Sequence, residues 1–299
     1  MRGVLLLPVA LAAVVLASGC TIPGTDIEIP IPFLGGGQEV VEYKDDIIII
    51  KSLQVTPGTE VKPGQALTLY ADIQNIQETM AGGEKVSATV ELYDYCLNMF
   101  SVEGENPETI DMQPREISSV EWVLTPKADI KLKTPCTLKV KVTYHYTTRV
   151  VTQITFVDEN ELNSRVRRGE SWRISGSSVI GYGPVKPYLT VESQQPISEN
   201  VNGFISLTIK NVGNGFVKNS KIGNDVKIEE EKLKIELAKE GGGGCVFKAP
   251  IDLINKQSYP LMCTVKPPGD ISIEQTYDMK AEVEYDYEFR KDIRVTVNP

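Results

Sequence analysis

Residues 136–146 read CTLKVKVTYHY, with an apolar or aromatic side chain at every second position. Side chains of a β-strand point alternately to its two faces, so this pattern predicts a strand with one buried face. The predicted inward set is Cys136, Leu138, Val140, Val142, Tyr144 and Tyr146. The polar set between them includes His145, the only histidine, which we expect to be exposed.

Short runs of the same kind fill the chain from about residue 47 onward, whereas helical periodicity over 12 or more residues is absent there. The other predicted inward sets are Ala88, Val90, Leu92 and Cys96; Val120, Trp122 and Leu124; Tyr259, Leu261, Cys263 and Val265; and Met279, Ala281, Val283 and Tyr285. This pattern predicts an all-β protein.

The chain also repeats itself. The segment 136–158 aligns with 277–299 at an offset of 141, with Lys139, Val142, Tyr144, Tyr146, Arg149 and Thr155 matched by identical residues. Residues 53–75 align with 189–211 at an offset of 136, where Leu53, Val55, Ile73 and Asn75 are matched. Each repeat has about 110 residues and about seven expected strands, the size of an immunoglobulin-like sandwich. We therefore expect two tandem immunoglobulin-like β-sandwich domains.

The full organisation follows from these repeats and from the composition between them. We predict a signal peptide at 1–19, a flexible tether at 20–46, a first sandwich at 47–157, a connector at 158–186 and a second sandwich at 187–299. In the connector, residues 158–168 are expected to form a short helix, with Asp158 near its start and Gly169 as its C-cap. Trp172 is expected to fix the angle between the domains.

The N-terminus predicts export. Arg2 precedes an apolar run from Val4 to Leu16 that Pro8 interrupts, and small residues follow it. A retained membrane helix is the alternative, but it needs about 20 apolar residues. Residues 16–20, LASGC, resemble the lipobox of prokaryotic lipoproteins, with Ala17 where Leu is usual. That resemblance implies cleavage before Cys20, acylation of its sulfur and a membrane anchor.

The cysteine count agrees with this interpretation. With Cys20 assigned to lipid, two cysteines remain in each predicted domain. We expect disulfides Cys96–Cys136 and Cys245–Cys263, because neither pair needs contact between domains and an exported protein meets an oxidising compartment. Cys96 and Cys136 fall on predicted core faces, so we expect their bond to join two packed sheets. A zinc site is the alternative, but the spacing contains no C-x-x-C.

Two short motifs point to a family. Residues 61–65 read VKPGQ before one expected strand, and 210–213 read KNVG after its counterpart. They resemble CARDB-type (cell-adhesion-related, bacterial and archaeal) immunoglobulin-like modules, which carry Pro-Gly before the second strand and Asn-x-Gly after it. Each repeat here has half of that pattern. The resemblance implies an extracellular, non-catalytic module.

Charge and composition exclude several functions. The net charge is −9, which disfavours nucleic acid as a partner. A single histidine and no reactive cysteine leave no nucleophile–base pair, so we expect no enzyme, no cofactor and no metal. A carboxylate-based envelope hydrolase is the alternative, as is Ca²⁺ bound at the domain junction by Asp158, Glu159 and Glu161.

Tyr93 and Tyr95 form the candidate binding surface. They lie at the opposite parity to Val90 and Leu92, so both are predicted to point away from the core. Outward tyrosines can stack on a sugar or a protein partner. The sequence thus predicts a non-catalytic, lipid-anchored envelope protein that acts as a spacer and as a recognition, adhesion or scaffold module for an envelope protein or polysaccharide. Assembly by strand donation is a further alternative.

Overall fold

The computed structural model describes residues 45–78, 85–170, 173–237, 244–269 and 271–299. The described residues belong to one compact unit that ends at Pro299. The predicted signal peptide, Cys20, most of the tether and Trp172 lie outside the described residues.

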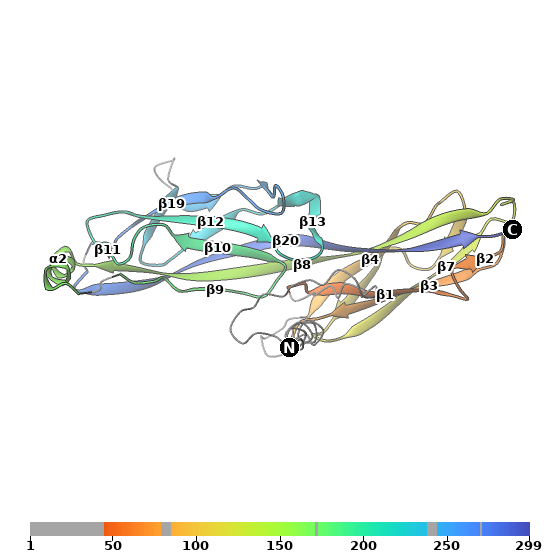
Figure 1. Cartoon of the computed structure of the whole chain (residues 1–299), viewed down its shortest axis with the longest axis horizontal. Helices are drawn as coiled ribbons and strands as arrows, with labels where there is room; N and C mark the ends of the chain where they lie inside the picture. Colours follow the sequence, from red (N-terminus) through yellow and green to blue (C-terminus); the bar gives the residue numbers. More distant parts are fainter. Residues whose placement is uncertain (1–44, 79–84, 171–172, 238–243, 270) are drawn as a thin grey trace, which may run out of the picture. The chain divides into compact units, whose positions relative to one another are not determined.

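The protein is all-β and folds into two immunoglobulin-like lobes, shown in Figure 1. Each lobe has its own four-stranded antiparallel sheet with the same strand order. In the first lobe the order is β1 (Ile48–Thr56), β3 (Leu67–Asn75), β7 (Ile117–Pro126) and β5 (Phe100–Glu103). In the second it is β10 (Val185–Val191), β12 (Gly203–Asn211), β19 (Leu261–Lys266) and β16 (Lys234–Leu237).

A single large sheet packs against both four-stranded sheets. Its main strand order is β17 (Cys245–Phe247), β15 (Val226–Glu229), β20 (Glu274–Val297), β8 (Thr134–Val157), β4 (Val86–Asp94) and β6 (Glu108–Met112). The short strands β2 (Glu60–Val61), β9 (Ser178–Ile180), β11 (Ile197–Ser198) and β13 (Phe216–Val217) join it at the sides. The remaining elements are a two-stranded sheet of β14 (Lys221–Ile222) and β18 (Ile251–Asp252), helix α2 (Glu159–Arg168) and the 3₁₀ turn η2 (Lys218–Ser220).

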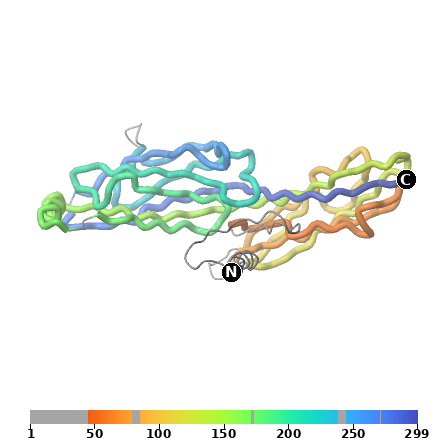
Figure 2. The backbone as a smooth tube through the Cα atoms, viewed as in Figure 1, coloured from red at the N-terminus to blue at the C-terminus, as the bar shows by residue number. Residues whose placement is uncertain are grey.

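Strands β8 and β20 belong to both lobes. Each has 24 residues, or about 80 Å at 3.3 Å per residue. They pair antiparallel from Thr134↔Val297 to Val157↔Glu274. In the first lobe, β8 also pairs with β4. Farther along the same strand, in the second lobe, β8 pairs with β9 and β11 (Figures 1 and 2). Part of each sequence repeat therefore completes the sandwich of the other, which the sequence analysis missed.

The registers agree with the repeat. Leu53 pairs with Ala71 in the first lobe, and Leu189 pairs with Leu207 in the second, which are the same positions at the offset of 136. Trp122 lies opposite Leu69, and Cys263 lies opposite Ile205, the equivalent residue. The cysteine of the second lobe thus occupies the place of the tryptophan in the first.

Most predicted inward residues are buried, with Val142 and Trp122 fully so. Cys96, Tyr146 and Leu261 are partly buried, and Tyr259 is exposed, at 72%. The strand β19 begins only at Leu261, after Pro260, so the alternation does not extend back to Tyr259.

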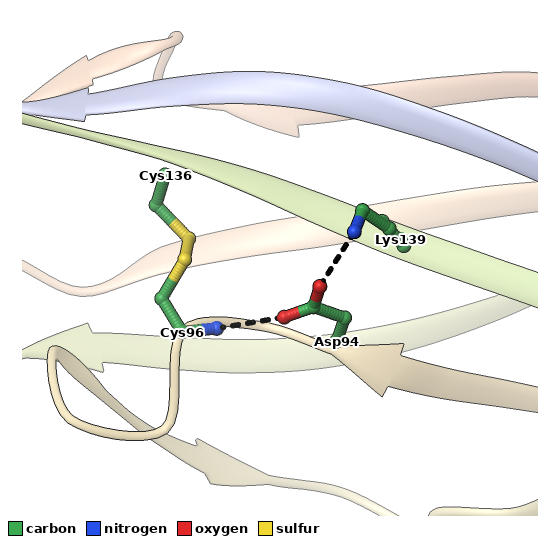
Figure 3. Close-up of a disulfide and its surroundings, with 4 residues drawn as sticks. All are labelled: Asp94, Cys96, Cys136 and Lys139. Carbon is green, nitrogen blue, oxygen red and sulfur yellow. Dashed lines mark hydrogen bonds and ion pairs between the residues drawn. A yellow bond between two sulfur atoms is a disulfide. The ribbon is translucent and has the colours of Figure 1, made fainter.

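Both disulfides join the pairs that the spacing favours. Cys96 and Cys136 have Cα atoms 6.2 Å apart, and Cys245 and Cys263 have Cα atoms 6.1 Å apart. Cys245 on β17 and Cys263 on β19 connect two packed sheets. The expectation that Cys96–Cys136 does the same is wrong, because Cys96 follows β4, the neighbour of β8 in the same sheet (Figure 3).

Candidate recognition surface

A β-bulge decides where the two candidate tyrosines point. Leu92 of β4 pairs with Val140 of β8, but the next pair is Asp94 with Lys139, so Tyr93 is the extra residue. A bulge shifts the alternation by one position. The Asp94 carboxylate accepts a hydrogen bond from Lys139 Nζ at 2.7 Å, shown in Figure 3. That bond lowers the pKa of Asp94.

The bulge places the two tyrosines in different surroundings. Tyr95 is half-buried and packs against the hydrophobic core, so the prediction that it points outward is wrong. Tyr93 is also half-buried, but its ring lies beside charged groups of the outer face of the large sheet. The candidate surface therefore keeps Tyr93 and loses Tyr95.

Two cations flank the Tyr93 ring. Lys141 Nζ lies 5.4 Å from the ring centroid, and Arg290 Cζ lies 5.7 Å from it. The same guanidinium lies 5.5 Å from the centroid of Phe216, whose side chain is 52% exposed. We call Phe216, Arg290, Tyr93 and Lys141 the Tyr93 strip. Its members lie on four strands, β13, β20, β4 and β8, that are far apart in the sequence. The sequence pattern around Tyr93 therefore identified only Tyr93 itself.

Carboxylates hold both cations in place. Glu91 lies 2.9 Å from Lys141 Nζ, and Glu288 accepts a hydrogen bond from Arg290 Nε. The side chain of Glu288 is only 12% exposed, so its oxygens are fixed and the guanidinium is oriented over the two rings. The strip thus presents aromatic and guanidinium groups beside carboxylates that balance the charge of its two cations.

The strip occurs in one repeat only. At the repeat offsets, Glu229 replaces Tyr93, and Glu282 replaces Lys141. The third equivalent residue, Arg149, pairs with Glu282 at 2.8 Å instead of stacking on a ring. The two repeats share their strand order, but their outer surfaces differ at these positions.

The remaining predicted residues have ordinary surroundings. His145 is exposed, as predicted, and its Nδ1 lies 3.1 Å from Asp286 Oδ1. The part of the chain that the structure describes contains no group of three or more His, Cys, Asp or Glu side chains placed to hold a metal ion. It also contains no helix long and apolar enough to cross a membrane.

The predicted connector helix is confirmed as α2. Asp158 caps it by accepting a hydrogen bond from Glu161 N at 2.9 Å, and Gly169 ends it with φ 69°. Glu159 accepts a hydrogen bond from Asn200, and Glu161 pairs with Arg165. The three carboxylates considered for Ca²⁺ therefore have protein partners.

Four tyrosines lie where the lobes meet; three of them are buried, and Tyr146 is partly buried against the core. These junction tyrosines are Tyr144, Tyr146, Tyr285 and Tyr287. The Tyr144 hydroxyl accepts a hydrogen bond from Ile47 N at 3.3 Å, and the Tyr287 hydroxyl accepts one from Gly215 N at 2.8 Å. Burial raises the pKa of Tyr144, Tyr285 and Tyr287. The alternation predicted an inward position for Tyr144, Tyr146 and Tyr285 but not a place between two lobes.

The fully buried carboxylate of Asp46 lies at the same junction, where it accepts hydrogen bonds from Asn214, including one of 2.9 Å from the side chain. Beside it, Asp45 pairs with Lys186 at 3.2 Å. These two residues end the predicted tether, so the tether joins the folded body between the lobes.

Comparisons with known proteins add little. No protein family and no curated protein matches the chain. Among solved structures, the collagen adhesin CNA from S. aureus is similar over 85% of this chain and 93% of its own, at 10% sequence identity and a TM-score of 0.13.

Proposed function

We propose that this chain is an exported, lipid-anchored, non-catalytic recognition protein of the cell envelope, and that the Tyr93 strip is the surface that contacts its partner. The partner is another envelope protein, because a flat strip of aromatic and guanidinium groups suits a protein surface better than a deep small-molecule site. Neither an enzymatic reaction nor a cofactor forms part of this proposal.

The location rests on two observations. Disulfides persist in oxidising compartments, and the folded chain has two of them. The N-terminal sequence has the order of a signal peptide, residues 1–19, that is followed directly by Cys20. Two acyl chains on Cys20 suffice for stable membrane attachment.

The recognition role rests on the strip. Tyr and Arg are enriched among the residues that contribute most to protein–protein binding. Arg290 is already oriented by Glu288 and stacked on Tyr93 and Phe216, so little side-chain entropy is lost when a partner binds. The strip can therefore offer apolar area and hydrogen-bond donors together.

Site-specific photo-crosslinking in intact cells tests this role. A photo-reactive phenylalanine at position 93 is expected to capture one envelope protein, and Arg290→Ala in the same chain is expected to reduce that capture at least tenfold. Position 229 is the matched control, since it is the equivalent position of the other repeat. Equal products from positions 93 and 229 would reject the strip as the recognition surface.

The anchor is tested separately. Cys20→Ala is expected to move the protein from the membrane fraction to a soluble exported fraction or to leave it as uncleaved precursor, while the melting temperature of the folded body stays the same. Mass spectrometry of the purified N-terminal peptide should find acyl chains on Cys20. Recovery of unmodified, full-length protein from the cytosol would contradict both export and anchoring.

A further inference from the structure

The outer face of the four-stranded sheet in the second lobe carries an open hollow of about 620 Å³. Thr190 of β10, Ser206 of β12 and Met262 of β19 lie in one row across it, because Ser206 pairs with both of the others. Phe204 and Thr208 flank Ser206 on the same face of β12, since they lie two residues to either side of it.

Hydroxyl groups form the floor of the hollow. Ser206 is only 6% exposed and lies deepest, whereas Thr190 is exposed and Thr208 is half-buried. Ser206 Oγ donates a hydrogen bond to Glu192 Oε1. The hydroxyls can donate and accept hydrogen bonds, and the carboxylate accepts them, at the surface of a regular sheet.

Apolar side chains flank this floor. Phe204 is 49% exposed and Met262 is 40% exposed, both large values for side chains in the middle of a sheet. The backbone of Phe204 is held on both sides, because its N–H donates to Ser193 Oγ at 2.8 Å and its carbonyl accepts from Glu192 N at 2.8 Å. The ring is therefore presented on a fixed backbone.

The hollow has little charge. Glu192 is the only ionisable residue in its lining, and its carboxylate is already hydrogen-bonded. The equivalent face of the first lobe is different: Asp72 stands in the place of Thr208, Glu121 in the place of Met262, and Thr68 in the place of Phe204. Asp72 there accepts hydrogen bonds from Ser52 and Ser119, both of 2.6 Å. The combination of exposed aromatic, thioether and hydroxyl groups thus belongs to the second lobe.

We infer that this hollow binds a neutral polysaccharide chain. A sugar ring has an apolar C–H face, which stacks on an aromatic ring, and a rim of hydroxyls, which pair with hydroxyl and carboxylate groups. The hollow offers both kinds of group without a cation in its lining, so an acidic glycan or a nucleic acid has no counter-charge there. Its residues are separate from the Tyr93 strip, so the inference is independent of the proposed function.

Isothermal titration calorimetry of the full chain with cellohexaose, laminarihexaose, xylohexaose and chitohexaose tests the inference. At least one of these oligosaccharides is expected to bind with a dissociation constant below about 10 mM. Phe204→Ala is expected to weaken that binding at least tenfold, and Thr190→Lys, which places a long charged side chain across the hollow, to abolish it. Thr68→Ala, at the position of the first lobe that is equivalent to Phe204, is the matched control and should leave the affinity unchanged.

Three results would overturn the inference. The first is no binding of any of the four oligosaccharides by protein of native circular dichroism. The second is binding that survives both Phe204→Ala and Thr190→Lys, since the sugar would then sit elsewhere. The third is a concentration-dependent dimer in sedimentation velocity that Phe204→Ala dissociates, because a second copy of the chain would then occupy the hollow.

Discussion

His145 and Asp286 lie directly opposite each other on β8 and β20, and they are also equivalent residues of the two repeats, 141 positions apart. An antiparallel pair in which a residue faces its own counterpart has a local two-fold axis through that pair. The neighbours follow the same rule: Tyr144 faces Tyr287, and Tyr146 faces Tyr285. The two lobes are thus related around His145 and Asp286 as the subunits of a symmetric dimer are.

This register predicts a cross-strand disulfide. Opposite residues of an antiparallel pair have Cα atoms about 4.5–5.5 Å apart, within the range for a disulfide. We expect His145→Cys combined with Asp286→Cys to oxidise quantitatively in the folded chain, detected as a linked peptide by mass spectrometry. His145→Cys combined with Glu284→Cys, a diagonal pair, should stay reduced. A linked diagonal pair would show a different register.

The junction also depends on glycines. A Cβ added at Gly213 would lie 2.4 Å from the Tyr287 hydroxyl and 2.5 Å from Asp46 Oδ1. Gly213→Ala is therefore expected to lower the free energy of unfolding by about 1–3 kcal/mol, measured by denaturant titration. Gly223→Ala meets no atom within 4 Å and is the control, with an expected change below about 0.5 kcal/mol. Equal stabilities of the two variants would contradict the close packing at the junction.

The sequence could predict the strands, the repeat, the disulfide pairs and α2, because each depends on local periodicity, spacing or capping. It could not predict that β8 and β20 each serve both lobes. Alternation indicates which face is buried but not which strand lies alongside, and a 24-residue strand is far outside the usual range. One signal was present: after Pro135, residues 136–157 contain no Gly, Pro or Asn at which a hairpin could turn.

The candidate site was less predictable than the fold. Tyr95 was misplaced because one bulge residue reverses the parity of everything beyond it, and no local composition marks the bulge at Tyr93. Phe216 and Arg290 reach the strip through pairings more than 100 residues away in sequence from Tyr93. Such contacts depend on the shared strands and cannot be read from the neighbourhood of Tyr93.

The junction tyrosines predict a loss of stability at high pH. Burial raises the pKa of Tyr287 above its unfolded value of about 10. Above pH 10 the unfolded chain loses a proton that the folded chain keeps. The contribution of this tyrosine to the free energy of unfolding is therefore fully present below pH 10 and falls as the pH rises. Each such tyrosine contributes a slope of about 1.4 kcal/mol per pH unit.

Tyr287→Phe removes one of these protons. We expect the fall in unfolding free energy between pH 10 and 11.5 to be shallower in this variant by about 1.4 kcal/mol per pH unit, measured by guanidinium denaturation. Tyr259→Phe, at a side chain that is 72% exposed, is the matched control and should leave the slope as it is in the wild type. A wild-type slope in Tyr287→Phe would mean that its hydroxyl is not buried as described.

The two disulfides should open in a fixed order. Thiol–disulfide exchange needs access of a thiolate to a sulfur atom. Cys245 and Cys263 are fully buried between two sheets, whereas Cys96 is half-buried at the end of β4. Native protein in dithiothreitol is therefore expected to lose Cys96–Cys136 first. Timed alkylation with iodoacetamide, followed by peptide mass spectrometry, measures the order, and both pairs should react together in guanidinium. Earlier labelling of Cys245 in the native protein would show that the sheets of the second lobe separate more readily than the end of β4.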